Sequence, residues 1–200
     1  MATSTVEDYL KEIYLAQQRS RADRIATGTV ASALGVTPGT ATSMVKALAD
    51  AGLVAHEPYA GVRLTPAGVR LAARVVRRHR LVEVFLVQVL GMSWSEVHVE
   101  AEILEHALSD RLVDRMDAML GHPTVDPHGD PIPSPEGDVE EPRHQIPLST
   151  AATGAIWAVA RVADQSAEFL TLLGRHGLMP GSSLTVAALD PAADTVDIRP

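Results

Sequence analysis

Proline is concentrated in one stretch of this chain, and that stretch limits how the chain can fold. Seven of the 13 prolines fall between Gly121 and Pro147. Proline has no backbone N–H and a fixed φ, so a segment this rich in it forms neither a helix nor an interior strand. The sequence therefore predicts a linker or wrapping arm at residues 122–147, with a structured region on each side.

The region before this stretch has the pattern of a winged helix-turn-helix. The expected helices and strands cover residues 5–18, 29–34, 37–52, 53–56 and 62–64. Gly35 makes the turn between two helices, and Thr37 followed by Pro38 is a cap with proline at the first helical position. The two strands are short enough to form a hairpin wing. We predict a DNA-binding domain at residues 1–65.

A helical domain and a small module complete the expected architecture. Another Thr-Pro pair, Thr65-Pro66, opens a long helix that Gly91 ends, and Ser93 and Ser109 are caps for two more helices. These helices predict a dimerisation and metal-binding domain at residues 66–121. Beyond the linker, a strand, a short helix and a hairpin predict a small α+β or barrel-like module at 148–200. The fold class is therefore mainly α.

The charge of the chain is divided unevenly. The net charge is −8, but residues 1–90 hold 11 Lys+Arg against 7 Asp+Glu, whereas residues 91–200 hold 6 against 18. The first half therefore carries +4 and could meet phosphate. The second carries −12, which either keeps the chain in solution, repels nucleic acid or concentrates carboxylates for a cation. The chain has no cysteine, which excludes a disulfide scaffold and a thiol nucleophile. We see no signal peptide and no apolar run long enough for a membrane span, so we expect a cytoplasmic protein.

Histidine and glutamate residues, which are common metal ligands, are concentrated on two consecutive predicted helices. His98, Glu102, Glu105 and His106 are spaced so that they share one helical face. The preceding helix adds His79 and Glu83, four residues apart. Carboxylates and imidazoles are the ligands of divalent first-row metals. A single pair of this kind is usually a solvated surface, but six such residues favour a metal site.

Known enzyme patterns fit these residues poorly. Di-metal carboxylate proteins use Glu-x-x-His on helices, but Val76, Ser95 and Ile103 stand three residues before the histidines. The peptidase motif His-x-x-Glu-His would need a histidine where Glu102 stands, and there is no Gly-x-Ser-x-Gly elbow. We expect that the chain is not an enzyme. A helical metal-storage protein or metalloenzyme is the alternative outside the regulators.

The predicted recognition helix would enter the major groove of double-stranded DNA. Its candidate contact residues are small hydroxyl side chains, with a lysine for the backbone and an arginine on the wing: Thr37, Thr40, Thr42, Ser43, Lys46 and Arg63. Hydroxyl side chains suit thymine methyl groups, water-mediated contacts and phosphates better than bidentate guanine readout. A protein-binding role for the helix-turn-helix remains the alternative.

The sequence resembles the diphtheria toxin repressor family of metal-dependent transcriptional repressors over most of residues 5–135. The resemblance rests on the helix-turn-helix together with Val6-Glu7-Asp8-Tyr9-Leu10, Leu64-Thr65-Pro66-Ala67-Gly68, Arg78-His79-Arg80-Leu81-Val82-Glu83, residues 97–106 and Asp126-Pro127-His128-Gly129-Asp130-Pro131-Ile132-Pro133. It implies a DNA-binding domain, a dimerisation domain with two metal sites and a C-terminal SH3-like module, which here is short enough to be incomplete.

The resemblance also implies the metal ligands. It assigns a primary site to Asp8, Glu102, Glu105 and His106. It assigns an ancillary site to His79, Glu83 and His98, with Gln165 and Glu168 as further candidates from the module.

The ligand types favour the manganese-sensing branch of the family. Iron sensors carry Met and Cys where this chain has Asp8 and Glu102. Some manganese sensors have a further carboxylate at the position of Lys11. A cation there either disfavours the two-metal arrangement of those sensors or points to solvent.

The predicted function is a manganese-dependent repressor that binds operator DNA as a metal-activated homodimer and controls metal homeostasis genes. Mn²⁺ is the expected cofactor, Fe²⁺ is the alternative for an iron-dependent repressor of the same family, and Co²⁺ or Zn²⁺ binding in vitro is expected. Asp8 precedes the helix-turn-helix, whereas the other primary ligands follow the wing. A metal bound by all four would therefore fix the pose of the DNA-binding domain without touching DNA.

Overall fold

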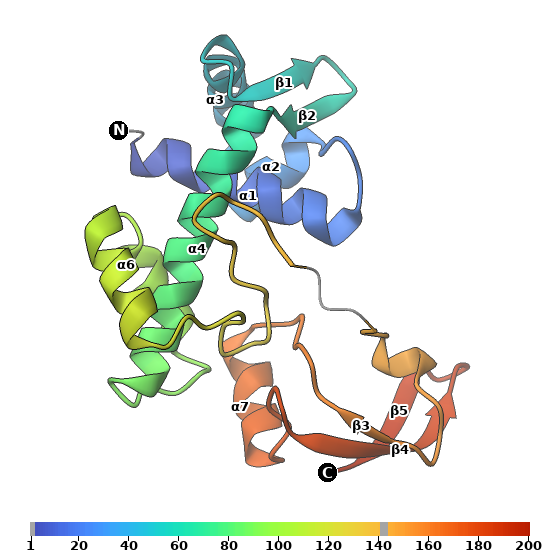
Figure 1. The fold of residues 1–200 in the computed structure, drawn as a ribbon. Helices are drawn as coiled ribbons and strands as arrows, with labels where there is room; N and C mark the ends of the chain where they lie inside the picture. Colours follow the sequence, from blue (N-terminus) through green and yellow to red (C-terminus); the bar gives the residue numbers. More distant parts are fainter. Residues whose placement is uncertain (1–2, 141–143) are drawn as a thin grey trace. The chain divides into compact units, whose positions relative to one another are not determined.

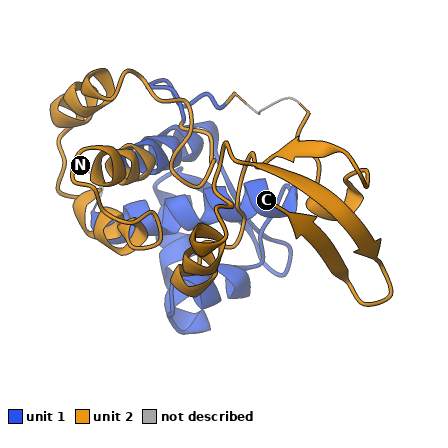
Figure 2. Ribbon diagram, turned by 90° about the horizontal axis from the view of Figure 1, so that it is seen from below, with its two compact units in different colours: residues 1–78, 133–139 blue, residues 79–132, 140–200 orange. Residues whose placement is uncertain are grey.

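The computed structural model describes residues 3–140 and 144–200, so Pro142 of the proline-rich stretch lies outside the described residues (Figure 1). The chain forms two compact units (Figure 2). Unit 1 comprises Met1–Arg78 and Pro133–Val139, and unit 2 comprises His79–Ile132 and Glu140–Pro200. The boundary between them falls inside one long helix.

Unit 1 contains the predicted winged helix-turn-helix. Its elements are α1 (Ser4–Ser20), α2 (Thr27–Ala33), α3 (Pro38–Asp50), β1 (Val54–Glu57) and β2 (Gly61–Leu64). Thr37 caps α3 as expected, because its Oγ1 accepts a hydrogen bond from the Thr40 amide at 3.2 Å. The strands pair antiparallel, with Val54 opposite Leu64. Helix α1 begins slightly earlier than predicted, with Thr3 as its cap.

The core of unit 1 is almost entirely apolar. Leu10 and Ile13 of α1, Val45 of α3 and Val62 of β2 are fully buried in one cluster. Gly61 has a φ of 104°, and a Cβ there would lie 2.5 Å from the Ile25 carbonyl oxygen. The wing therefore approaches the backbone so closely that only glycine fits.

Part of the proline-rich stretch returns to unit 1. Residues 133–139 lie beside the first half of α4 (Pro66–Gln88): the buried Arg77 donates to the Pro133 carbonyl at 2.8 Å. Val139 packs on the apolar core, and a Cβ on Gly137 would lie 3.2 Å from Ala73 Cβ. Of the two forms predicted for this stretch, these residues take that of a wrapping arm.

The helical part of unit 2 consists of the second half of α4, α5 (Val97–Leu104) and α6 (Asp110–Met119). Leu81 and Val84 of α4 pack with Val113 of α6 in one cluster. Ser109 caps α6 as predicted. Helix α5 is shorter than the sequence suggests: it begins after Glu96 without a side-chain cap. Its last residue is Leu104, so a turn separates α5 from α6.

The C-terminal module is also part of unit 2. It contains η1 (Leu148–Thr150), β3 (Ile156–Ala158), α7 (Ala167–Arg175), β4 (Ser183–Asp190) and β5 (Thr195–Arg199). The strands form an antiparallel sheet in the order β3-β4-β5. Leu178, Leu184 and Val186 are buried in its core. The strand, helix and hairpin are those that the sequence predicts, and the small sheet is consistent with an SH3-like module.

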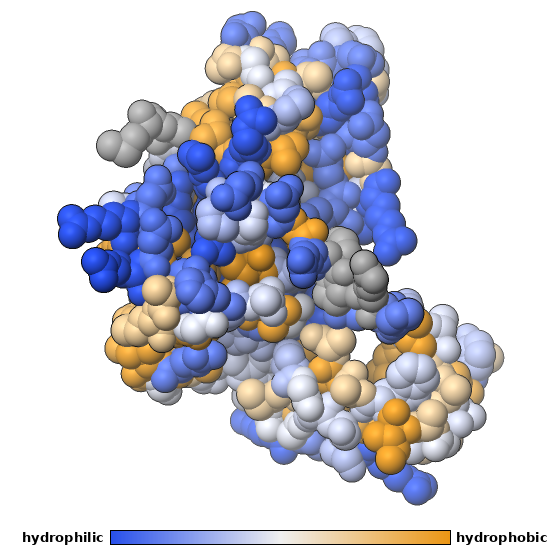
Figure 3. Space-filling model, viewed as in Figure 1, coloured by the Kyte–Doolittle hydropathy of each residue, from blue (hydrophilic) through white to orange (hydrophobic). Residues whose placement is uncertain are grey.

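The surface view in Figure 3 shows hydrophilic and apolar residues intermixed on one face. Among the described residues, no helix is both long enough and apolar enough to cross a bilayer.

Candidate metal centre

His79, on α4, lies between two groups of predicted ligands. Its Nδ1 atom is 2.6 Å from Glu105 Oε2 and 3.6 Å from Glu102 Oε1. Its Nε2 atom is 3.1 Å from Glu83 Oε1 and 3.2 Å from His98 Nδ1. One imidazole therefore contacts four other residues that the sequence singled out, and the ligands of the two predicted sites in unit 2 are direct neighbours.

The end of α5 supplies the remaining predicted ligands of unit 2. Glu105 follows the last helical residue and is fully buried. His106 Nε2 is 3.3 Å from Glu105 Oε1. Helix α5 itself presents His98 and Glu102, whose side chains are 47% and 40% exposed. The cluster thus has a buried base on α4 and an open side on α5.

The predicted ligand from unit 1 lies on α1. Asp8 is half-buried, one turn before Lys11. Of the two alternatives for Lys11, the one in which it points to solvent is wrong, because Lys11 is only 4% exposed. An amphipathic helix buries one stripe of residues, and Lys11 falls beside Leu10 and Tyr14 on that stripe.

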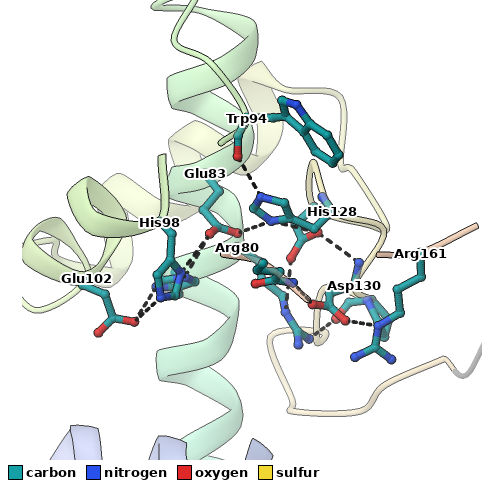
Figure 4. Close-up of polar contacts among 12 residues, drawn as sticks. Arg80, Glu83, Trp94, His98, Glu102, His128, Asp130 and Arg161 are labelled. Carbon is teal, nitrogen blue, oxygen red and sulfur yellow. Dashed lines mark hydrogen bonds and ion pairs between the residues drawn. The ribbon is translucent and has the colours of Figure 1, made fainter. Parts of the chain in front are cut away.

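A second buried cluster adjoins the first and was not assigned from the sequence (Figure 4). Glu83 uses both carboxylate oxygens: Oε1 faces His79 and His98, while Oε2 is 3.7 Å from His128 Nδ1. His128 Nδ1 is also 3.9 Å from Asp126 Oδ1. Glu83, Asp126 and His128 are all buried, and one potential ligand atom from each lies within 4.8 Å of the others.

The turn that contains Asp126 and His128 is held by several hydrogen bonds. Asp126 Oδ1 accepts hydrogen bonds from the amides of His128 and Asp130, at 2.8 and 3.0 Å. The buried Arg80 of α4 lies 3.6 Å from Asp126 Oδ2 and donates to the Pro131 carbonyl. Gly129 has a φ of 88°. The side chain of Asp126 thus stabilises the turn through two backbone amides and also lies close to the Glu83 carboxylate.

Burial and mutual contact shift the proton affinities in this cluster. Burial, with the carboxylates of Glu83 and Asp130 nearby, raises the pKa of Asp126 to about 7, although Arg80 opposes this. Burial alone would raise the pKa of Glu83, but His128, His79 and His98 hold it well below its ordinary value. Burial would lower the pKa of His128, yet the contact with Glu83 raises it.

These residues fit a divalent cation. His128 is 0% exposed, and its Nδ1 atom has no hydrogen-bond partner among the described residues although it faces two carboxylates. A buried polar atom without a partner is unfavourable, and a cation would satisfy it. Two carboxylate oxygens and one imidazole nitrogen are hard or intermediate donors, which suit manganese, iron or zinc. The cluster around His79 offers donors of the same kinds.

The two weaker candidates from the C-terminal module do not join either cluster. Gln165 Nε2 donates to Asp130 Oδ2 at 2.7 Å, and Arg161 forms an ion pair with the same carboxylate. Glu168 lies exposed in the first turn of α7. Through Gln165 and Arg161 the module therefore contacts Asp130 in the turn at Asp126–Asp130.

Most of the predicted DNA-contacting residues are accessible on α3. Thr40, Ser43 and Lys46 are exposed, and Thr42 is half-buried. The hydroxyl groups of Thr42 and Ser43 donate to backbone carbonyls one turn earlier, at 2.8 and 3.0 Å. Their methyl and methylene groups and the Lys46 ammonium thus remain for contacts with DNA.

The predicted wing contact is already in an ion pair. Arg63 lies 3.6 Å from Asp23, and both side chains are largely exposed. An exposed pair of this kind is worth about 0 to 1 kcal/mol, so a phosphate can compete with Asp23 for Arg63.

Three family models match consecutive parts of the chain. Residues 1–62 match the iron dependent repressor N-terminal DNA binding domain, residues 65–134 match the iron dependent repressor metal binding and dimerisation domain, and residues 146–199 match the FeoA domain. The two clusters of potential metal ligands in unit 2 lie in the second of these, and α3 lies in the first.

Individual relatives agree with the family models. The chain is 35% identical over 129 residues to the HTH-type transcriptional regulator MntR of Lysinibacillus sphaericus, covering 62% of this chain and 91% of that protein. It is 28% identical to the iron-dependent repressor IdeR of Mycobacterium leprae, covering 98% and 89%. A solved structure of a manganese-dependent transcriptional repressor in complex with manganese superposes with a TM-score of 0.87 at 44% identity, covering 96% of this chain and 88% of the other.

The MntR protein of Lysinibacillus sphaericus is 35% identical, and the match covers 91% of its length. Together with the two repressor family models, this match establishes which family the chain belongs to. The chain belongs to the iron-dependent repressor family: it is a metal-dependent transcriptional repressor with a DNA-binding domain and a metal-binding and dimerisation domain, and it is not an enzyme.

Proposed function

We propose that this chain is a cytoplasmic, manganese-responsive repressor. It binds operator DNA as a metal-activated homodimer and controls metal homeostasis genes. The observation that carries the proposal is the donor set around His79 among the described residues, which consists of carboxylates and imidazoles in a chain without cysteine. Donors of this kind suit manganese, whereas thiolates and thioethers favour softer metals.

The primary regulatory ion is proposed to bind Asp8 together with Glu102, Glu105 and His106. Asp8 belongs to unit 1 and the other three to unit 2. An ion held by all four would restrict the orientation of the DNA-binding domain. Two recognition helices of a symmetric dimer must reach grooves about 34 to 36 Å apart, so this restriction raises DNA affinity without adding a DNA contact.

A second ion is proposed to bind near Glu83. His79, Glu83 and His98 form the ancillary position that the family resemblance implies. The buried oxygen of Glu83, with Asp126 and His128, offers an adjoining position that is more enclosed. Because metal binding displaces protons from its ligands, occupancy of this position should increase as the pH rises.

The experiment that tests the proposed function is DNA binding by the apo-protein, titrated with manganese, iron, cobalt and zinc under reducing conditions. We expect manganese to activate, and zinc to bind tightly but activate poorly, because zinc prefers four ligands in a tetrahedron. Equal DNA affinity in chelator and in manganese would refute the proposal.

Glu102 tests the choice of metal. Glu102→Cys introduces a soft thiolate and should shift activation from manganese towards iron, cobalt or zinc. Glu100→Cys, on the same helix but outside the clusters, is the matched control. An unchanged ranking of metals in the Glu102→Cys protein would remove the main support for manganese.

An iron-dependent repressor is the second candidate. The similarity to the iron-dependent repressor of Mycobacterium leprae extends over 98% of this chain, including the C-terminal module. Stronger activation by iron than by manganese in the same titration would favour it.

A further inference from the structure

The imidazole of His128 is fixed through the nitrogen that faces away from the cluster. Its Nε2 atom lies 2.8 Å from the backbone carbonyl oxygen of Trp94. A carbonyl oxygen can only accept, so Nε2 carries a hydrogen. In the neutral imidazole the other nitrogen, Nδ1, then has the free lone pair, and this is the atom that faces Glu83 (Figure 4).

Trp94 also holds the ring itself. The indole and imidazole planes stack with centroids 5.8 Å apart and an angle of 27° between them. Trp94 is buried and lies in a turn before α5, where no side chain caps the helix. The carbonyl and the indole of one residue thus determine both the tautomer and the orientation of His128.

The indole of Trp94 packs against the C-terminal module. It shares an apolar cluster with Val162 and with Leu170 of α7. A Cβ on Gly174 of α7 would lie 3.2 Å from Trp94 Nε1, tighter than an ordinary van der Waals contact. A side chain at this position would therefore require the indole or the helix to shift by a few tenths of an ångström.

The module also contacts the backbone of the His128 turn. The Val162 amide donates to the His128 carbonyl at 2.9 Å. A Cβ on Gly129 would lie 2.1 Å from the Ala160 carbonyl oxygen, so the two backbones touch. The module therefore contacts the main chain of His128 directly and its side chain through Trp94.

We propose that Trp94 is a positioning residue for the Glu83, Asp126 and His128 cluster, and that through it the packing of α7 sets the affinity of the cluster for a divalent cation. The inference rests on the proposed role of this cluster in metal binding. Residues that orient a metal ligand typically change affinity by about 10- to 100-fold when they are altered.

The first test reads the tautomer in the full-length protein. With histidine labelled by nitrogen-15 and cadmium-113 as the ion, we expect coupling between cadmium and His128 Nδ1, and a hydrogen on Nε2 that exchanges slowly with water. Coupling to Nε2, or a hydrogen on Nδ1 in the loaded protein, would overturn the proposal. Absence of any coupling at His128, with cadmium bound elsewhere, would instead refute the proposed metal position itself.

The second test changes α7 and leaves every ligand in place. Gly174→Leu should weaken cadmium or manganese binding at the cluster by about tenfold, measured by calorimetry, and should speed exchange of the Nε2 hydrogen. Thr171→Leu places the same side chain on an exposed position of the same helix and is the control. Unchanged affinity and unchanged exchange in a folded Gly174→Leu protein would overturn the proposal.

Conservative variants keep the test decisive if Gly174→Leu fails to fold. Trp94→Phe retains an aromatic ring against His128 and should keep most of the cation affinity, whereas Trp94→Ala should lose about tenfold.

Substitutions of His128 test which of its nitrogens is the ligand. His128→Asn keeps a polar atom near the Nδ1 position, and His128→Gln keeps one near Nε2. A ligand role for Nδ1 predicts tighter cation binding by the Asn variant than by the Gln variant, and the reverse order would contradict it.

Discussion

The two units bury different kinds of residue. In unit 1 the described core is apolar, and Lys11 and Arg77 are its buried charged side chains. Unit 2 buries a much larger polar set in its helical part and the following turn: His79, Arg80, Glu83, Glu105, Asp117, Asp126, His128 and Asp130. Buried charges are costly unless they are paired or coordinate a metal.

This difference in buried residues suggests that an ion affects the two units differently. Unit 1 is held by hydrophobic burial and helix caps, so we expect its shape not to depend on an ion. Unit 2 contains mutually repelling carboxylates, Glu83 beside Asp126, that a cation would neutralise. We expect metal to act on the stability and dynamics of unit 2 first, and the following predictions test that expectation in order of decreasing effect.

Glu83→Gln should have the largest effect, because this carboxylate belongs to both clusters in unit 2. We expect cation affinity to fall by about 100-fold or more, at or beyond the upper end for residues that only orient a ligand. Calorimetric titration measures it, with the exposed Glu100→Gln as control. Equal loss in both variants would show that general charge, rather than the clusters, binds the ion.

Metal should protect unit 2 more than the recognition helix. A ligand present at 100 times its dissociation constant stabilises the state that binds it by about 2.7 kcal/mol. In hydrogen exchange we expect slower exchange of amides in α5 and in the turn at residues 126–130 after adding manganese, and little change in α2 and α3. Uniform protection of all four segments would erase the distinction between the units.

Asp126 should make the metal-free protein less stable as the pH rises. Its pKa of about 7 in the folded state exceeds the ordinary value of about 3.9. The stability it contributes is therefore fully present below pH 4 and is lost as the pH rises towards 7 and beyond.

Asp126→Asn should remove that loss. In chelator, we expect the melting temperature of the variant to fall less than that of the unmodified protein between pH 5 and pH 8. Each kcal/mol corresponds to roughly 2 to 4 °C for a chain of this size. The exposed Asp114→Asn is the control, and parallel pH profiles for all three proteins would contradict the prediction.

Thr37→Ala should have the smallest effect and should leave metal binding alone. Loss of the cap on α3 costs about 1 kcal/mol, which denaturant unfolding can measure, and Thr37→Ser should restore most of it. Because the cap belongs to unit 1, a change in cation affinity in Thr37→Ala would show that the units are not energetically separate.

Local sequence patterns predicted most elements because short-range interactions determine them. Thr37 and Ser109 cap the helices that they were expected to cap. Helix α5 differs because Ser93 Oγ pairs with Ser95 Oγ rather than starting a helix. The helix also ends earlier than expected, at Leu104, where the next residue, Glu105, makes a buried contact with His79. Tertiary contacts therefore override local propensity where the polar cluster forms.

The site was only partly predictable for the same reason. Helical spacing identified His79, Glu83, His98 and Glu102, since residues three or four apart share a face. No periodicity connects Glu83 to His128, which lies 45 residues away in a turn between prolines. The available pattern was Asp126 and His128 two residues apart before Gly129, a spacing that does not by itself identify a partner on α4.

The absence of cysteine from the clusters has a consequence for the conditions under which such a sensor can work. Thiolates are oxidised stepwise by peroxide, first reversibly and then irreversibly, and each step removes a metal ligand. Carboxylates and imidazoles do not follow that path, and the chain has no cysteine at all. The residues around His79 and Glu83 would keep their donors under oxidising conditions, so the repressor could go on reporting metal supply during oxidative stress.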